Sequence, residues 1–69
     1  MTVTLYTRAG CPCCESARTV LRAAAEPYEE IDVAATPGAE ERLRALTGDV
    51  VVPVLVEDDG EVRVGFGCV

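Results

Sequence analysis

The sequence contains no histidine and no tryptophan, and its six basic residues, all arginines, are outnumbered by twelve acidic residues. The resulting net charge of -6 argues against binding to nucleic acids or to anionic membrane surfaces, because like charges repel. No apolar stretch approaches membrane-spanning length, and no basic segment followed by an apolar core marks a secretory signal. We therefore expect a cytoplasmic protein that does not contact a membrane.

Repeats and low-complexity tracts are also missing, so nothing in the chain reads as a linker. Hydrophobic residues make up 49% of the 69 positions, which is enough to fill one small core. We expect residues 1–69 to form a single domain of modest stability.

The first half of the chain alternates strand and helix patterns. Residues 3–7 alternate in period two, as a strand does, and a helix is predicted to begin at Cys11 or Pro12 and to end before Glu26-Pro27. A second strand is predicted over residues 28–33. Strand, helix and strand of this length predict a right-handed unit with parallel strands. The helix should pack its apolar positions on the sheet and turn its polar positions elsewhere; the apolar set is Ala17, Val20, Leu21 and Ala24, and the polar set is Glu15, Arg18, Thr19 and Arg22.

The second half predicts a helix and a hairpin. Thr36 and Pro37 suit the N-cap and first position of a helix that stops at Gly48. Residues 50–56 are apolar like a buried strand, but Pro53 cannot donate to a central ladder and should mark the strand's entry. Its bond to the preceding residue is a candidate cis peptide. Residues 58–60 then turn the chain into a last antiparallel strand around residues 62–64.

The most informative motif is Cys11-Pro12-Cys13-Cys14, placed where the first strand turns into the first helix. A thiol at a helix N-terminus has its pKa lowered, from about 8.5 to roughly 3.5 to 7.5 in such motifs. Cys14 comes round to the same side one turn later, close enough to attack a mixed disulfide formed on Cys11. The spacing predicts Cys11 as the nucleophile and Cys14 as the resolving thiol of a disulfide exchange reaction.

Two other interpretations of the cysteines compete with this one. Small secreted domains carry structural disulfides, but they spread their cysteines along the chain, whereas three of the four here are clustered. The four thiolates could also bind zinc or an iron-sulfur cluster. Pro12 and the lack of histidine weaken that interpretation, and a structural zinc site usually joins two separated ligand pairs.

The order strand, Cys-Pro-x-Cys, helix, strand, helix, Val-Pro, hairpin, Gly resembles the glutaredoxin family over nearly the whole chain. The segments that carry the resemblance are 5–14, 52–54 and Gly65-Phe66. The resemblance implies an α/β, thioredoxin-like fold of the glutaredoxin type with a four-stranded mixed sheet. In that family the proline that corresponds to Pro53 is cis and faces the cysteine pair.

The resemblance also implies roles for residues around the cysteines. The backbone of Val52 would pair with the incoming thiol substrate, and Arg8, three residues before the nucleophile, would help to hold a substrate carboxylate. The substrate-binding residues expected on this basis are Arg8, Pro12, Val52, Pro53 and Gly65. No metal or resident cofactor is implied. The external reductant would be glutathione, another low-molecular-weight thiol, or thioredoxin reductase with NADPH.

Some features depart from individual branches of the family. The Trp-Cys-Gly-Pro-Cys signature of thioredoxins is absent, and so are the Asp that follows Gly-Gly in glutathione-using members and the final helix. Residues 57–61 followed by Gly65-Phe66 are similar instead to the NrdH redoxins, electron donors recharged by thioredoxin reductase. A minimal fold without the C-terminal helix would leave apolar surface uncovered, so we expect a homodimer through that face.

The function predicted from the sequence is reduction of protein or low-molecular-weight disulfides, with a disulfide-containing substrate and a reductase as partners. A metal or iron-sulfur carrier and a redox-sensing binding module are the alternatives. Cys13 and Cys68 are candidate accessory thiols. Cys13 also suits a small, partly buried apolar position near Ala17, whereas Cys68 follows a glycine and could reach the active-site sulfurs or remain an incidental thiol.

Overall fold

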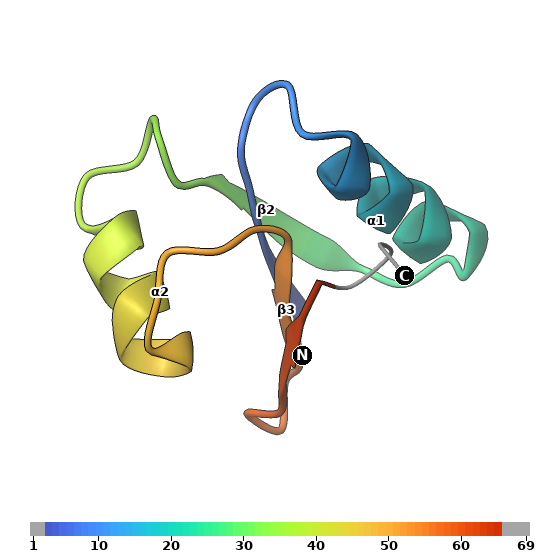
Figure 1. Cartoon of the computed structure of the whole chain (residues 1–69). Helices are drawn as coiled ribbons and strands as arrows, with labels where there is room; N and C mark the ends of the chain where they lie inside the picture. Colours follow the sequence, from blue (N-terminus) through green and yellow to red (C-terminus); the bar gives the residue numbers. More distant parts are fainter. Residues whose placement is uncertain (1–2, 66–69) are drawn as a thin grey trace.

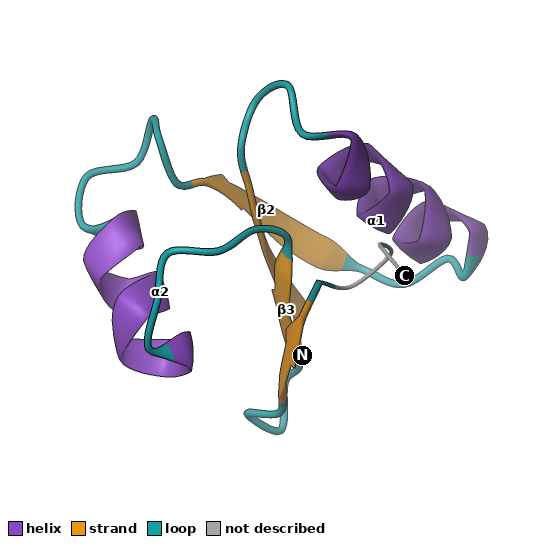
Figure 2. Cartoon of the chain, in the orientation of Figure 1, coloured by secondary structure: helices purple, strands orange, loops and turns teal. Residues whose placement is uncertain are grey.

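A four-stranded sheet with one helix against each face makes up the fold (Figures 1 and 2). In this computed structural model, residues 3–65 are described. The elements are β1 (Val3–Thr7), α1 (Pro12–Ala23), β2 (Tyr28–Asp32), α2 (Ala39–Thr47), β3 (Val54–Val56) and β4 (Val62–Val64). The strand order is β2-β1-β3-β4, with β1 and β2 parallel and the other pairs antiparallel. This confirms the predicted thioredoxin-like fold with a mixed sheet.

The core is divided between the two faces of the sheet because neighbouring strand residues point to opposite sides. On the α1 face, the buried residues are Val3, Leu5, Ala17, Leu21 and Leu55. On the α2 face, they are Tyr6, Val33, Ala39, Leu43 and Val54. Each helix is therefore fixed to the sheet by its own small cluster, and α1 carries the cysteine motif at the end nearest the β1–α1 loop (Figure 1).

Helix α1 begins where the sequence predicts. Cys11 is the N-cap with extended backbone angles, and Pro12 occupies the first helical position, where its missing N–H has no intrahelical partner. The apolar face is narrower than predicted. Val20 is 47% exposed, and with Ala24 it lines a groove of about 230 Å³ beside β3.

The start of α2 differs from the prediction. The N-cap is Gly38, not Thr36, and the helix begins at Ala39. Gly38 has a φ of 81°, a left-handed conformation that no helix can run through, so Pro37 stays in the preceding turn. The Ala39 N–H donates to the Thr36 carbonyl at 3.1 Å within that turn. The predicted stop at Gly48 is confirmed, and this glycine also has a positive φ.

The predictions for the second half of the sheet are confirmed. Strand β3 begins at Val54, directly after Pro53, and the Val52–Pro53 peptide bond is cis. The turn at residues 58–60 joins β3 to an antiparallel β4. Within residues 3–65, neither helix is long and apolar enough to cross a membrane.

Candidate active site

Strand register places the predicted site residues at one edge of the sheet. Thr7, the last residue of β1, pairs with Asp32, the last residue of β2, so the loops that follow both strands leave at the same edge. Tyr6 pairs with Val54, and Val54 pairs with Val64, which brings the start of β3 and the end of β4 to that edge as well. The segments gathered there are 8–11, 33–38, 52–53 and residue 65 (Figure 1).

A backbone hydrogen bond joins the segment that contains Pro53 to the residue that follows β4. The Gly65 N–H donates to the Pro53 carbonyl at 2.8 Å, and Pro53 is fully buried. Val52 is half-buried just before it. The structure therefore brings three of the predicted substrate-binding residues together, next to the end of β1 from which Arg8 and the cysteine motif continue.

Cys11 and Cys14 are both free thiols with different surroundings. Cys11 is half-buried at the helix N-cap, whereas Cys14 is 0% exposed beneath it. The N–H groups of Cys14 and Glu15 donate to the Cys11 carbonyl at 3.1 and 3.3 Å, which closes the first turn of α1. The accessible sulfur is thus the first of the pair, as the sequence predicts.

Hydrogen bonding and burial shift the pKa values of the two thiols in opposite directions. The pKa of Cys11 is lowered, first by a hydrogen bond from the Cys14 side chain and then by the backbone of Cys14 and Cys13, with a smaller contribution from the charge of Arg8. The pKa of Cys14 is raised, chiefly because burial disfavours its thiolate. Cys11 is therefore the sulfur that is deprotonated first as the pH rises, and Cys14 is the one that keeps its proton to higher pH.

The remaining cysteines lie outside this pair. Cys13 is half-buried in the first turn of α1 and is not a free thiol. Cys68 lies outside the described residues, so its role as an accessory thiol stays a prediction. No group of three or more His, Cys, Asp or Glu side chains within residues 3–65 is arranged to hold a metal ion.

A small pocket of about 270 Å³ opens directly beside Cys11. It is lined by Gly10, Cys11, Pro12 and Glu15. Pro12 is exposed here, consistent with its predicted contact with substrate. Glu15 was expected only to face away from the sheet, and its place in the wall of this pocket was not predicted.

An ion-pair network behind Cys14 was also missed by the sequence analysis. Arg18, one turn after Cys14, does not point away from the sheet but bonds to Glu30 on β2, with its Nη2 2.8 Å from Oε2. The hydroxyl of Thr7 donates to the same carboxylate at 2.9 Å. The only signal in the sequence is the spacing of Arg18 from Cys14; its partner depends on the register of β2 beside β1.

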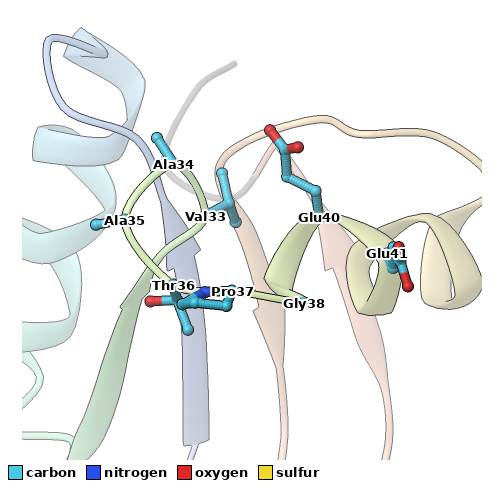
Figure 3. Close-up of a pocket in the computed structure, with 8 residues that line it drawn as sticks. All are labelled: Val33, Ala34, Ala35, Thr36, Pro37, Gly38, Glu40 and Glu41. Carbon is cyan, nitrogen blue, oxygen red and sulfur yellow. The ribbon is translucent and has the colours of Figure 1, made fainter.

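A larger pocket of about 400 Å³ lies at the same sheet edge, in the loop between β2 and α2. Its lining residues are Val33, Ala34, Ala35, Thr36, Pro37, Gly38, Glu40 and Glu41. Figure 3 shows the loop on one side and the two glutamates projecting from the first turn of α2 on the other. None of these residues was predicted as a site residue.

Comparison with known proteins agrees with this geometry. Residues 3–62 match the sequence pattern of the Glutaredoxin family. The Gene 56 protein of Mycobacterium phage L5 is 34% identical over 64 residues, which cover 93% of this chain and 62% of that protein. The chain therefore spans less than two thirds of this relative's length.

Solved structures are similar over most of their length. The thioredoxin-like protein BC3987 is 34% identical with a TM-score of 0.84, covering 93% of this chain and 86% of that one. The glutaredoxin-like NrdH-redoxin of Escherichia coli is 33% identical with a TM-score of 0.84, covering 96% and 84%. A glutaredoxin from Archaeoglobus fulgidus is 25% identical with a TM-score of 0.81, covering 93% and 74%. The chain therefore belongs to the glutaredoxin family.

Proposed function

We propose that this protein reduces protein or low-molecular-weight disulfides by dithiol exchange through Cys11 and Cys14. The observation that carries the proposal is the difference between the two free sulfurs. Cys11 is accessible and has a lowered pKa, whereas Cys14 is fully buried, protonated and hydrogen-bonded to it. A nucleophile and a resolving thiol need these two states in this order.

In the first step, the Cys11 thiolate attacks one sulfur of the substrate disulfide. A mixed disulfide forms on Cys11, the substrate S–S bond breaks, and the first half leaves as a thiolate that takes up a proton. Cys14 then loses its proton and attacks the Cys11 sulfur. The mixed disulfide breaks, the second half leaves as a thiol, and the protein retains a Cys11–Cys14 disulfide after passing two electrons to the substrate.

Residues across the sheet edge would hold the substrate during the first step. The backbone of Val52, before the buried Pro53, is proposed to pair with the incoming thiol, and Gly65 fixes Pro53 through its 2.8 Å hydrogen bond. Arg8 is exposed and its charge helps to lower the pKa of Cys11, so it can stabilise the thiolate before attack. Pro12 adds apolar surface to the pocket wall.

No resident cofactor takes part in these steps, so an external donor must return the two electrons. We propose thioredoxin reductase with NADPH as this donor, and glutathione or another low-molecular-weight thiol as the alternative. Support for thioredoxin reductase comes from the glutaredoxin-like NrdH-redoxin of Escherichia coli. That protein is 33% identical to this chain and has a thioredoxin-like activity profile. A cytoplasmic location and a role in electron transport follow from the same proposal.

The experiment that tests the function measures NADPH oxidation in a disulfide-reduction assay. One series contains thioredoxin reductase, and a second contains glutathione with its reductase. We expect sustained turnover in the first series, loss of turnover in Cys11→Ser, and a stalled mixed disulfide in Cys14→Ser.

Other outcomes would contradict parts of the proposal. Turnover only with glutathione would replace the proposed donor but leave the exchange chemistry in place. A single stoichiometric oxidation without turnover would indicate a redox-sensing module. Metal content and visible absorption of protein purified without oxygen would reveal a metal or cluster carrier. Full activity of Cys11→Ser would overturn the assignment of the nucleophile.

A further inference from the structure

We propose that Glu15 determines substrate specificity by favouring disulfides that carry a positive charge close to the sulfur atoms. This inference rests on the proposed function and deepens it by naming the substrate class. The substrates expected are cationic small disulfides and protein disulfides flanked by Lys or Arg, with anionic disulfides reacting more slowly.

Glu15 lies beside Cys11 at the start of α1. It follows Cys14 directly in the first turn of α1 and lines the pocket that contains Cys11, Gly10 and Pro12. Its side chain is 80% exposed. A substrate whose disulfide reaches Cys11 therefore brings its neighbouring groups within the field of this carboxylate, which is screened over about 8 Å at physiological salt.

The negative charge of Glu15 is only weakly paired with Arg18, its helical neighbour. Arg18 Nη1 lies 3.8 Å from Glu15 Oε1, at the limit of an ion pair. The same guanidinium makes closer contacts with Glu30, where Nε lies 2.9 and 2.8 Å from the two carboxylate oxygens and Nη2 lies 2.8 Å from Oε2. Arg18 is thus directed toward the sheet, and Glu15 remains open to an incoming cation.

Arg8 is exposed and is not among the residues that line the pocket beside Cys11, so it does not face a substrate group held against Glu15. The positive charge of Arg8 helps to lower the pKa of Cys11, which means that it offsets the thiolate that attacks. Of the described residues that line this pocket, Glu15 is the one with a carboxylate. The whole chain adds to the same effect with its net charge of -6.

The test measures the first attack on three small disulfides that differ in charge. Fully reduced protein is mixed with cystamine (cationic), hydroxyethyl disulfide (neutral) or oxidised glutathione (anionic), and modification of Cys11 is followed after rapid quenching. We expect the ratio of the cystamine rate to the glutathione rate to fall about twofold to fivefold in Glu15→Gln, the range of exposed charge pairs. Glu15→Arg should lower this ratio further, and added salt should reduce the difference between wild type and variant.

Asp58→Asn is the matched control, because it removes the same charge from an exposed turn at the opposite end of β3. It should leave the ratio within the error of wild type. The inference is overturned if Glu15→Gln changes all three rates equally, or changes the ratio no more than Asp58→Asn does. If wild type reacts with none of the three disulfides, not even the neutral one, the proposed function fails and takes this inference with it.

Discussion

Arg18 and Glu30 form a forked ion pair that joins α1 to β2. Arg18 Nε donates to both oxygens of Glu30 at 2.9 and 2.8 Å, and Nη2 lies 2.8 Å from Oε2. Thr7, 1% exposed at the end of β1, donates its hydroxyl hydrogen to the same carboxylate. The Glu30 carboxylate therefore joins α1, β2 and the end of β1.

Replacement of Glu30 by Gln should destabilise the protein by about 1 kcal/mol, because the side chains are partly exposed and such pairs contribute modestly. For a domain of this size that corresponds to a fall in Tm of about 4 to 8 °C. Glu29→Gln is the control, since Glu29 is exposed on the opposite face of β2. Equal melting temperatures for the two variants in thermal denaturation would show that the ion pair does not stabilise the fold.

The same pair predicts a loss of stability in acid. Its hydrogen bonds from Arg18, and then from Thr7, hold the pKa of Glu30 below its usual range. A carboxyl with a lower pKa in the folded state stabilises fully above its unfolded pKa, about 4.3, and loses that contribution as the pH falls through the folded value. Urea unfolding between about pH 5 and pH 2.5 should therefore show a steeper loss for wild type than for Glu30→Gln. If wild type and Glu30→Gln lose stability equally as the pH falls, protonation of Glu30 is not the cause of the loss.

The hydrogen bond between the two cysteines makes a separate prediction for reactivity. Because the pKa of Cys11 is lowered first by the Cys14 side chain, the alkylation rate of Cys11 should reach half its maximum below the usual value of about pH 8.5. Cys14→Ala should move this midpoint upward, whereas Cys14→Ser keeps a hydroxyl donor and should move it less. Arg8→Gln should have a smaller effect than Cys14→Ala, since its charge contributes last. An unchanged midpoint in Cys14→Ala would show that the Cys14 side chain does not lower the pKa of Cys11.

Two glycine substitutions test the backbone conformation at the C-terminal end of α1. Ala25 has a φ of 54°, a left-handed conformation that favours glycine, whereas the C-cap Ala24 has a right-handed helical conformation. Ala25→Gly should stabilise the protein by about 0.5 kcal/mol, and Ala24→Gly should destabilise it by up to about 1 kcal/mol. Chemical denaturation measures both, and a loss of stability in Ala25→Gly would contradict the conformation described here.

Much of the fold follows from local sequence patterns. The alternation of residues 3–7, the proline at the start of α1 and the glycine after α2 each act within a few residues, and their predicted boundaries are confirmed. The predicted start of α2 was wrong because two local preferences compete there. Thr36 and Pro37 suit a helix start, but the positive φ of Gly38 prevents the helix from including them.

The candidate site likewise contains residues that the local sequence predicts and residues that only the folded structure brings together. The spacing of Cys11 and Cys14 predicts them as the reactive pair, and the Val-Pro resemblance predicts a cis Pro53; the cis bond is observed, and the roles of the residues stay predictions. The partner of Arg18 could not be predicted, because Glu30 is 12 residues away and meets it only once β2 lies beside β1 in the observed register. Glu15 was predicted only to point away from the sheet, and its side chain is exposed, but the pocket beside it forms only when the β1–α1 loop is folded.

The most direct test of the central claim is to identify the sulfur that receives the substrate. Fully reduced Cys14→Ser protein is mixed with hydroxyethyl disulfide, quenched and digested after Arg8 and Arg18, and the peptide 9–18 is sequenced by tandem mass spectrometry. The account predicts an adduct on Cys11 that persists in this variant, and a Cys11–Cys14 disulfide without adduct in wild type. An adduct mainly on another cysteine, or a wild-type adduct that survives with Cys14 still reduced, would contradict it.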